Sequence, residues 1–271
     1  SSLPEVVAIR RLADVEKLEK MMEHAAKAVV IGGGVLGLEA AWELKKAGID
    51  VQVLEAAPIL MGRQLDENAS DILRMFAEKS GVKISTGVSV EAVEGDGHVS
   101  GVRLSDGQVI PAEVVVVSAG VRANTALAKE IGLDADRAVK VNERMETSVP
   151  NVYACGDCAE FNGANYAVWP EASEQGRIAG ANAAGDQIEY AATAPTLTFH
   201  GMNTALFAAG DNGKNLLYKT AEFKDMGKGR YSKYYFLNNR LAGVIMIGDL
   251  SDMVKTTEAL EKHALYKDVL G

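Results

Sequence analysis

A glycine-rich segment at residues 32–37, Gly-Gly-Gly-Val-Leu-Gly, constrains the fold of this chain more than any other feature. It satisfies the pattern G-x-G-x-x-G, which by itself is a weak signal. Here it follows a short apolar run (residues 28–32) typical of a strand buried on both faces, and it opens a predicted helix over 35–46. A second buried strand, predicted over 50–55, ends in Glu55, 18 residues after the last glycine. This order predicts an α/β, Rossmann-like unit that binds a dinucleotide.

Each glycine of the motif has a separate physical reason. Gly32 permits the tight turn after the strand. Gly34 lets the backbone approach a pyrophosphate, and Gly37 lets the helix pack close to the strand. The helix begins at Val35 and Leu36, whose N–H groups are expected to face the phosphates together with the partial positive charge of the helix start.

Glu55 stands where the second strand of such a unit presents an acidic residue to the adenosine ribose. A carboxylate there accepts hydrogen bonds from the ribose hydroxyls and repels a 2′-phosphate, so NADH is expected to be preferred over NADPH. The first arginine beyond it is Arg63. Two alternatives stay open at this point: a glycine turn that binds no nucleotide, and FAD instead of NAD, because both dinucleotides use the same motif.

The rest of the first half alternates strands and helices and then changes character. A strand over 6–10 and a helix over 14–24, with Asp14 as its N-cap, come before the glycine motif. Gly48 suits the end of the helix that follows the motif, and Asp66 is expected to cap another. The remaining predictions are a helix over 66–79, strands over 82–86 and 114–118, and between them an antiparallel meander over 88–93, 99–104 and 108–111. One domain is therefore expected over 28–120.

The second half is predicted to hold two further regions, residues 121–192 and 193–271. The first has a short helix, a strand over 152–155 and a helix over 170–184 that begins with proline. The second reads as a small α+β domain. Its expected elements are strands over 197–200, 205–208, 216–220, 231–237 and 241–247, a turn at Asn238-Asn239, and a helix over 253–266.

Charge and composition exclude several classes of function. The net charge of −9 repels phosphate backbones, so nucleic acid is not expected as a partner. No apolar stretch approaches the ~20 residues of a membrane helix, and the first residues do not read as a secretory signal. Two cysteines build no disulfide framework, which favours a reducing cytoplasm.

Three downstream segments carry a resemblance to a known family. Residues 147–157 (TSVPNVYACGD) and 118–124 (SAGVRAN) are two of them, and residues 169–177 (WPEASEQGR) are the third. They resemble the second flavin motif, the end of the NAD domain and the flavin-facing helix start of the pyridine nucleotide–disulfide oxidoreductase superfamily. The resemblance implies FAD and NAD(H) as cofactors. It assigns Gly156 and Asp157 to the ribityl chain of FAD, Gly120 to the nicotinamide nucleotide, and Glu171 and Ala172 to the flavin pyrimidine edge, where a helix start stabilises negative charge.

The nearest branch is that of NADH:rubredoxin reductases, NADH oxidases and nitrite reductase flavoproteins. Residues 61–66 (MGRQLD), which include Arg63, resemble that branch, as does a small C-terminal domain with Gly248-Asp249. In this family Glu39 faces the junction of nicotinamide and flavin. A glutamate on a helix surface is the alternative interpretation of Glu39, and the residues alone do not choose between the two.

The superfamily opens with another G-x-G-x-x-G that holds the ADP half of FAD, and this sequence has no second copy. We therefore expect about a hundred residues, the size of one nucleotide-binding domain, to be missing at the start or supplied as a separate segment or subunit. Residues 1–27 and 121–192 would be a partial FAD-binding domain. Weak or absent FAD binding is expected of this chain, whereas NAD(H) binding should survive.

The function implied is hydride transfer from NADH to FAD, with electrons passed on to rubredoxin, dioxygen or a nitrite-reducing centre. No catalytic acid or base is expected, because such a protein stacks and tunes its cofactors. The main alternative is a non-catalytic NAD(H)-binding module without flavin, and a weaker one is an NADP-linked dehydrogenase. A homodimer stays open, and an acidic carrier could dock on lysines 214, 219, 224, 228 and 233.

Two further patterns favour no site. Cys155 and Cys158 form C-x-x-C, but Cys155 is expected to end a strand rather than to begin a helix, which disfavours a redox pair. Four scattered histidines make no metal pattern. The aromatic residues of 231–236 are expected to pack a sheet.

Overall fold

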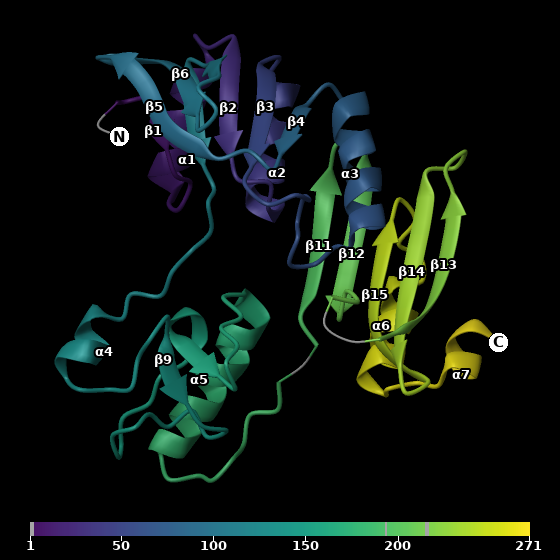
Figure 1. Cartoon of the computed structure of the whole chain (residues 1–271). Coiled ribbons are helices and arrows are strands. Elements are labelled where there is room, and N and C mark those ends of the chain that lie inside the picture. The colour runs from purple at the N-terminus through teal and green to yellow at the C-terminus, as the bar shows by residue number, and fades with distance from the viewer. Residues whose placement is uncertain (1–2, 193, 215–216) are drawn as a thin grey trace. The chain divides into compact units, whose positions relative to one another are not determined.

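A computed structural model of the chain describes residues 3–192, 194–214 and 217–271. It divides into two compact units: unit 1 holds residues 1–120 and 196–271, and unit 2 holds residues 121–195. Figure 1 shows the elements of both. Unit 1 contains three sheets, whereas unit 2 is built mostly from loops around one long helix.

Unit 1 is organised by a five-stranded parallel sheet in the order β1-β8-β2-β3-β4. Its strands are β1 (Val6–Val7), β2 (Lys27–Ile31), β3 (Asp50–Glu55), β4 (Lys83–Thr86) and β8 (Val114–Val117). β8 is apolar along its whole length and β2 is apolar after its first residue, Lys27, as expected for strands covered on both faces. The predicted α/β class and the strands of the glycine unit are confirmed. The strand predicted over 6–10 is wrong in length, since only Val6–Val7 pair with β8.

Three helices accompany this sheet: α1 (Leu12–Met22), α2 (Val35–Lys46) and α3 (Glu67–Lys79). The Asp66 side chain caps α3 by accepting from the Ala69 N–H at 2.9 Å, as predicted. Asp14 is not an N-cap, because the helix starts two residues earlier. Its carboxylate instead reaches back from the first turn to the N–H groups of Arg10 and Arg11 at 2.9 and 2.7 Å.

The predicted meander is confirmed as a three-stranded antiparallel sheet of β5 (Val90–Asp96), β6 (His98–Leu104) and β7 (Val109–Pro111). Its apolar side chains, Val102 and Leu104 among them, form one core with Val29 and Val115 of the parallel sheet. The meander is therefore the layer on one face of the parallel sheet.

The C-terminal region is a five-stranded antiparallel sheet in the order β11-β12-β15-β14-β13. Its strands are β11 (Thr196–Gly201), β12 (Thr204–Gly210), β13 (Lys219–Asp225), β14 (Arg230–Leu237) and β15 (Arg240–Ile247). Asn238 and Asn239 both have positive φ, 49° and 64°, which is the hairpin turn predicted for them. The strand expected over 216–220 begins at Leu216, outside the described residues, and the observed strand lies further along at β13.

The chain closes with two short helices rather than one. They are α6 (Met253–Glu261) and α7 (Tyr266–Leu270), and the predicted single helix over 253–266 is wrong. His263 lies between them with a φ of 47°, a left-handed conformation that a helix cannot continue through.

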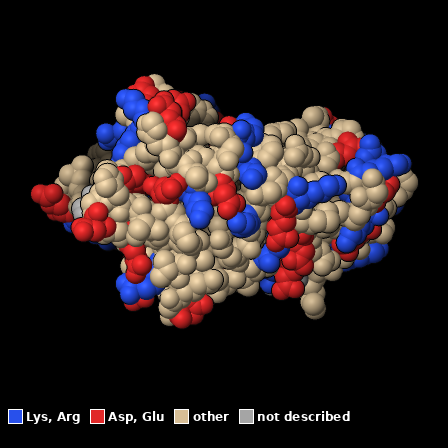
Figure 2. Space-filling model, turned by 90° about the horizontal axis from the view of Figure 1, so that it is seen from above, with Lys and Arg blue, Asp and Glu red and all other residues tan. Residues whose placement is uncertain are grey.

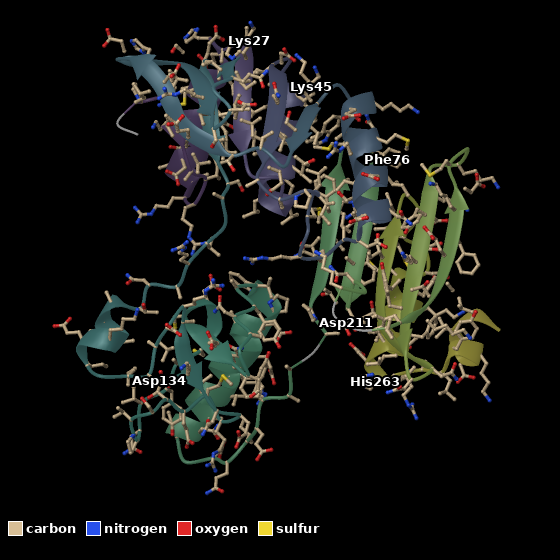
Figure 3. All side chains as sticks on the ribbon, in the orientation of Figure 1. Lys27, Lys45, Phe76, Asp134, Asp211 and His263 are labelled. Atoms are coloured by element: carbon tan, nitrogen blue, oxygen red, sulfur yellow. The ribbon has the colours of Figure 1, made fainter. Side chains whose placement is uncertain are left out.

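The parallel sheet and the C-terminal sheet of unit 1 share one hydrophobic core. Phe199 and Tyr235 of the C-terminal sheet are fully buried in the same cluster as Leu38 of α2 and Leu73 of α3. In Figure 3, Phe76 is labelled on α3 beside the C-terminal strands, and this side chain packs against that cluster. The predicted packing of the aromatic residues 231–236 is confirmed, because Tyr231, Tyr234, Tyr235 and Phe236 are all buried.

Unit 2 contains α4 (Ala126–Glu130), a parallel pair of β9 (Val139–Val141) and β10 (Ala159–Phe161), a 3-10 turn η1 (Gly156–Cys158) and α5 (Trp169–Ala183). Pro170 lies in the first turn of α5, as predicted. The strand predicted over 152–155 is wrong. That segment makes a single isolated bridge, between Tyr153 and Glu146, and forms no ladder.

Among the described residues, no helix is long and apolar enough to cross a membrane, and no group of His, Cys, Asp and Glu side chains is arranged to hold a metal ion.

Candidate functional site

The glycine turn between β2 and α2 is shaped by contacts that leave no room for a side chain. A Cβ at Gly32, where φ is +115°, would overlap the carbonyl oxygen of Ser118. A Cβ at Gly37 would overlap the carbonyl oxygen of Gly32. Both obstacles are backbone atoms, which cannot swing aside. The turn therefore brings the first turn of α2 directly against the end of β2.

The second glycine of the motif, Gly34, faces open space. No heavy atom lies within 4 Å of the position that a Cβ would occupy there. Gly34 is the N-cap of α2, and the first helical hydrogen bond runs from the Leu38 N–H to its carbonyl at 3.0 Å. The N–H groups of Val35, Leu36 and Gly37 accordingly have no acceptor within the helix. Open space beside unpaired helix-start N–H groups fits a phosphate, so the residues present fit the dinucleotide that the sequence predicts.

Glu55 ends β3 beside this turn and is held by backbone donors. One carboxylate oxygen accepts from the Gly33 N–H at 2.6 Å and the other from the Ala57 N–H at 2.7 Å. Each oxygen has a further lone pair, so the carboxylate can still accept from ribose hydroxyls.

Gly33 is a residue whose importance the motif does not reveal, because its position is unrestricted in G-x-G-x-x-G. A Cβ there would lie 2.7 Å from Leu60 Cδ2 and 3.0 Å from Glu55 Cβ. The run of three glycines in the sequence is the signal that could have indicated this third constraint.

These groups meet at one edge of the parallel sheet. β2, β3 and β8 run in the same direction, so Gly32, Glu55 and Gly120 all follow the carboxyl ends of their strands. Gly120 has a φ of +89° and open space where a Cβ would be. In open α/β sheets the carboxyl edge is where ligands bind.

Two other predicted site residues flank this edge in different ways. Glu39 is half-buried on α2, and burial raises the pKa of its carboxyl, while the charge of His200 on β11 acts in the opposite direction. Arg63 lies exposed in the loop between β3 and α3.

The residues predicted to hold flavin are gathered in unit 2. η1 carries Gly156 and Asp157, and it lies against the start of α5, where a Cβ on Gly156 would be 3.2 Å from that of Ala172. Gln175 of α5 accepts from the Gly156 N–H at 2.8 Å and fixes this arrangement. The fold thus brings Gly156 and Asp157 close to the start of α5 within unit 2.

The start of α5 differs from the prediction in its details. The Ala172 N–H is used inside the helix, where it donates to the Val168 carbonyl at 3.0 Å. The Glu171 side chain is buried and accepts a hydrogen bond from the Tyr190 hydroxyl, and burial raises the pKa of Tyr190. A flavin contact by Glu171 would therefore come from its backbone.

The C-x-x-C pair has the wrong environment for a redox centre. Cys155 precedes the 3-10 turn and does not end a strand, contrary to the prediction. Burial raises the pKa of its thiol, whereas a reactive cysteine needs a lowered one. Both cysteines are free.

Most of the lysines considered for docking an acidic carrier interact with neighbouring side chains. Lys233 pairs with Asp66 at 2.5 Å, Lys228 with Asp225 at 3.8 Å, and Lys219 lies 3.4 Å from the centre of the Tyr266 ring. Figure 2 shows acidic and basic side chains interspersed over the face in view.

A parallel sheet with a glycine turn and an acidic residue at its carboxyl edge defines a dinucleotide-binding protein. The chain belongs to the pyridine nucleotide-disulphide oxidoreductase family, whose model matches residues 3–176, and residues 195–264 match the rubredoxin NAD+ reductase C-terminal domain. The family resemblance seen in the sequence is thus confirmed. Members of this family are oxidoreductases that use NAD(P)H and FAD.

Individual relatives agree with this assignment. The chain is 34% identical over 260 residues to the NAD(P)H nitrite reductase of Bacillus subtilis (strain 168), which covers 96% of this chain and 32% of that protein. It is 27% identical over 265 residues to the NADH-rubredoxin oxidoreductase of Clostridium acetobutylicum, covering 98% of this chain and 66% of that one. The chain therefore spans about a third of the first relative and two thirds of the second.

Solved structures show the same fold. The crystal structure of a ferredoxin reductase from Rhodopseudomonas palustris superposes with a TM-score of 0.88 at 28% sequence identity. The match covers 97% of this chain and 66% of that one.

Proposed function

We propose that this chain is the NAD(H)-binding part of an NADH-dependent flavoprotein oxidoreductase. The observation that carries the proposal is the combination at one sheet edge of open space at Gly34, the start of α2 and the carboxylate of Glu55. The helix start would hold the pyrophosphate through the N–H groups of Val35 and Leu36. Gly120 would pass beside the nicotinamide end, with Glu39 near it.

The same geometry supports NADH as the preferred nucleotide. The Gly33 and Ala57 N–H groups fix the Glu55 carboxylate in place, so it cannot turn away from a 2′-phosphate without losing both hydrogen bonds. The repulsion and the lost hydrogen bonds would both oppose NADPH. Arg63 is exposed in the loop that follows β3 and would lie on the adenosine side.

Flavin would be held by Gly156 and Asp157 together with the start of α5. When bound, the flavin would take a hydride from the nicotinamide and release electrons to an acceptor. The protein's own part is to fix the ribityl chain and to place a helix start, with its partial positive charge, toward the flavin. We assign no catalytic acid or base.

The acceptor and the domain roles are further parts of the proposal. The Clostridium relative is named for rubredoxin, and the Bacillus relative for nitrite. A small electron-transfer protein such as rubredoxin is the acceptor we favour, with dioxygen or a nitrite-reducing centre as alternatives. We retain residues 28–120 as the NAD(H) domain, 193–271 as the C-terminal domain, and 1–27 with 121–192 as part of a FAD domain. A reducing cytoplasm is the compartment that two free cysteines favour.

A visible absorption spectrum tests the flavin part of the proposal. The purified protein is measured before and after FAD is added and the excess removed, and NADH is then added without oxygen. A retained flavin spectrum that NADH bleaches supports the reductase. Calorimetric titration with NADH and NADPH is run alongside, and we expect tighter binding of NADH in the wild type and a smaller preference in Glu55→Gln.

A non-catalytic NAD(H)-binding module is the second candidate. It predicts NADH binding with no retained flavin, even at excess FAD. Absence of NADH binding in the folded protein would contradict both candidates.

A further inference from the structure

We infer that the C-terminal sheet positions the nucleotide loop, residues 61–66, and thereby sets the affinity for NADH through Asn212, Lys233 and Tyr235. This inference rests on the proposed function, because it concerns the same dinucleotide site. It adds residues more than 140 positions away in sequence that the glycine motif does not include.

The nucleotide loop is tied to the glycine turn on one side. Met61 is buried with a φ of 47°, and its N–H donates to the Gly33 carbonyl at 3.0 Å. The Met61 carbonyl in turn accepts from the N–H groups of Gln64 and Leu65 at 2.8 and 3.0 Å. A displacement of this loop would therefore move Gly33, whose own N–H holds Glu55.

The other side of the loop is held by the segment that follows β12. Asp211, labelled in Figure 3, and Asn212 come directly after this strand. The Asn212 side-chain amide donates to the carbonyls of Arg63 and Leu65 at 3.2 and 3.3 Å. One amide group thus bridges two carbonyls of the loop.

The end of the loop is held by β14. The same oxygen of Asp66 accepts from the Lys233 ammonium at 2.5 Å and from the Tyr235 hydroxyl at 2.8 Å. The side chains of Asp66 and Lys233 are only 17% and 14% exposed, so water screens this pair little. Because Asp66 is also the N-cap of α3, the contact fixes the point where the loop becomes helix.

The physical consequence is pre-organisation. A loop whose carbonyls and terminal carboxylate are already bound loses less conformational entropy when a nucleotide settles against it. Removing the hydrogen bonds that Asn212, Lys233 and Tyr235 make to this loop should weaken the binding of the adenosine half of the nucleotide. The residues proposed to touch the ligand would be unchanged.

Two other hydrogen bonds between α3 and the C-terminal sheet provide matched controls. Asn203 donates to the Ser80 hydroxyl at 3.1 Å, and Asn68 to Glu222 at 3.3 Å. Neither contacts residues 61–66. Asn203→Asp matches Asn212→Asp in chemistry, and an aspartate at position 203 can still accept from Ser80.

The experiment compares wild type, Asn212→Asp, Tyr235→Phe and Asn203→Asp. Dissociation constants for NADH and for ADP-ribose, which lacks nicotinamide, are measured by calorimetry, and hydrogen exchange of the Gln64 and Leu65 amides is followed without ligand. We expect Asn212→Asp to bind both ligands about 10-fold more weakly and Tyr235→Phe about 3-fold more weakly. Exchange at both amides should be faster in these two variants, and Asn203→Asp should match the wild type.

The outcomes distinguish a failure of the proposed function from a failure of this inference alone. A folded wild type that binds no NADH overturns the proposed function and this inference with it. A wild type that binds NADH, together with Asn212→Asp and Tyr235→Phe variants of unchanged affinity and amide exchange, overturns the inference alone. If Asn212→Asp does not fold, Tyr235→Phe decides, because it removes one hydroxyl and leaves the Asp66 to Lys233 pair in place.

Discussion

Two turns are assigned to nucleotides: residues 32–37 in unit 1 and residues 155–158 in unit 2. Different kinds of contact hold each turn in place. In unit 1 the backbone at Gly32 and Gly37 is in close contact with other backbone atoms. The carboxylate of Glu55 accepts hydrogen bonds from the N–H groups of Gly33 and Ala57. In unit 2 the contact at Gly156 is with the side chain of Ala172, and neutral side-chain amides make hydrogen bonds to the turn. Gln175 accepts from Gly156, and Asn165 donates to the carbonyls of Asp157 and Ala159 at 3.0 and 2.7 Å.

The difference indicates how each turn responds to change. Backbone atoms in contact cannot relax without moving a strand or a helix, whereas a side-chain contact yields by small shifts. The turn in unit 1 should therefore be intolerant of added atoms, and the turn in unit 2 should be more tolerant of them.

The largest effect is expected for Gly37→Ala. Its Cβ would overlap the Gly32 carbonyl, so α2 must move away from the end of β2. We expect the free energy of unfolding to fall by about 3 kcal/mol and NADH binding to be lost. Urea denaturation and calorimetric titration measure the two quantities. A Gly37→Ala protein of wild-type stability would contradict the close approach of these two backbone segments.

Gly34→Ala separates binding from stability in the same turn. The Cβ would enter open space, and an alanine at the N-cap should cost less than about 1 kcal/mol of unfolding free energy. The same methyl group would stand where the pyrophosphate is proposed to lie. We expect NADH to bind about 30-fold more weakly, equivalent to the loss of roughly one charge-assisted hydrogen bond. Unchanged affinity would place the phosphates elsewhere.

Gly156→Ala tests the tolerance of unit 2. Here φ is +70°, and the added methyl would lie 3.2 Å from the Cβ of Ala172. We expect a loss of about 1 kcal/mol, mostly from the left-handed backbone. The double variant Gly156→Ala, Ala172→Gly relieves the contact and leaves the backbone cost. Ala172→Gly has its own cost within α5, so urea denaturation of both single variants and the double variant is needed to obtain the part due to packing. A loss as large as that for Gly37→Ala would remove the distinction between the turns.

The first region could be predicted from sequence, because its signals are local. The bounds of α2 and β3 follow from apolar periodicity and from glycines at fixed positions, and they match the structure to the residue. In unit 2 the predicted strand over 152–155 failed because a β-like segment needs a partner, and Tyr153 finds one only in a single bridge. β9 and β10, three residues each, are too short to carry a pattern.

The contacts that complete the site in unit 1 also cannot be predicted from local sequence patterns. Asp66 could be recognised as a helix cap, but its partner Lys233 is 167 residues away. Lys233 instead looked like part of a basic surface. Sequence separation of this size leaves no spacing signal, so these contacts to the nucleotide loop become visible only once the parallel sheet and the C-terminal sheet of unit 1 are seen to share a core.

Lowering the pH should destabilise unit 1 in particular, because unit 1 contains Asp66. Burial by itself would raise the pKa of this carboxyl, but hydrogen bonds from Lys233, Ala69 and Tyr235 outweigh burial and lower the pKa below its ordinary value. A carboxyl with a lowered folded-state pKa contributes stability above its unfolded value of 3.8, and this contribution is lost as the pH falls through the folded-state pKa. We expect the unfolding free energy of unit 1 to decline from about pH 5 toward pH 3.

The chain offers its own reporters for this measurement, because its two tryptophans lie in different units. Trp42 is on α2, and Trp169 is on α5. In a Trp169→Phe background, urea denaturation followed by Trp42 fluorescence reports unit 1. Asp66→Asn keeps the helix cap, since asparagine caps as well as aspartate, and removes the titrating group. It should lower stability at neutral pH and flatten the decline in acid. An equally steep decline in Asp66→Asn would show that other carboxylates of unit 1 cause the acid sensitivity.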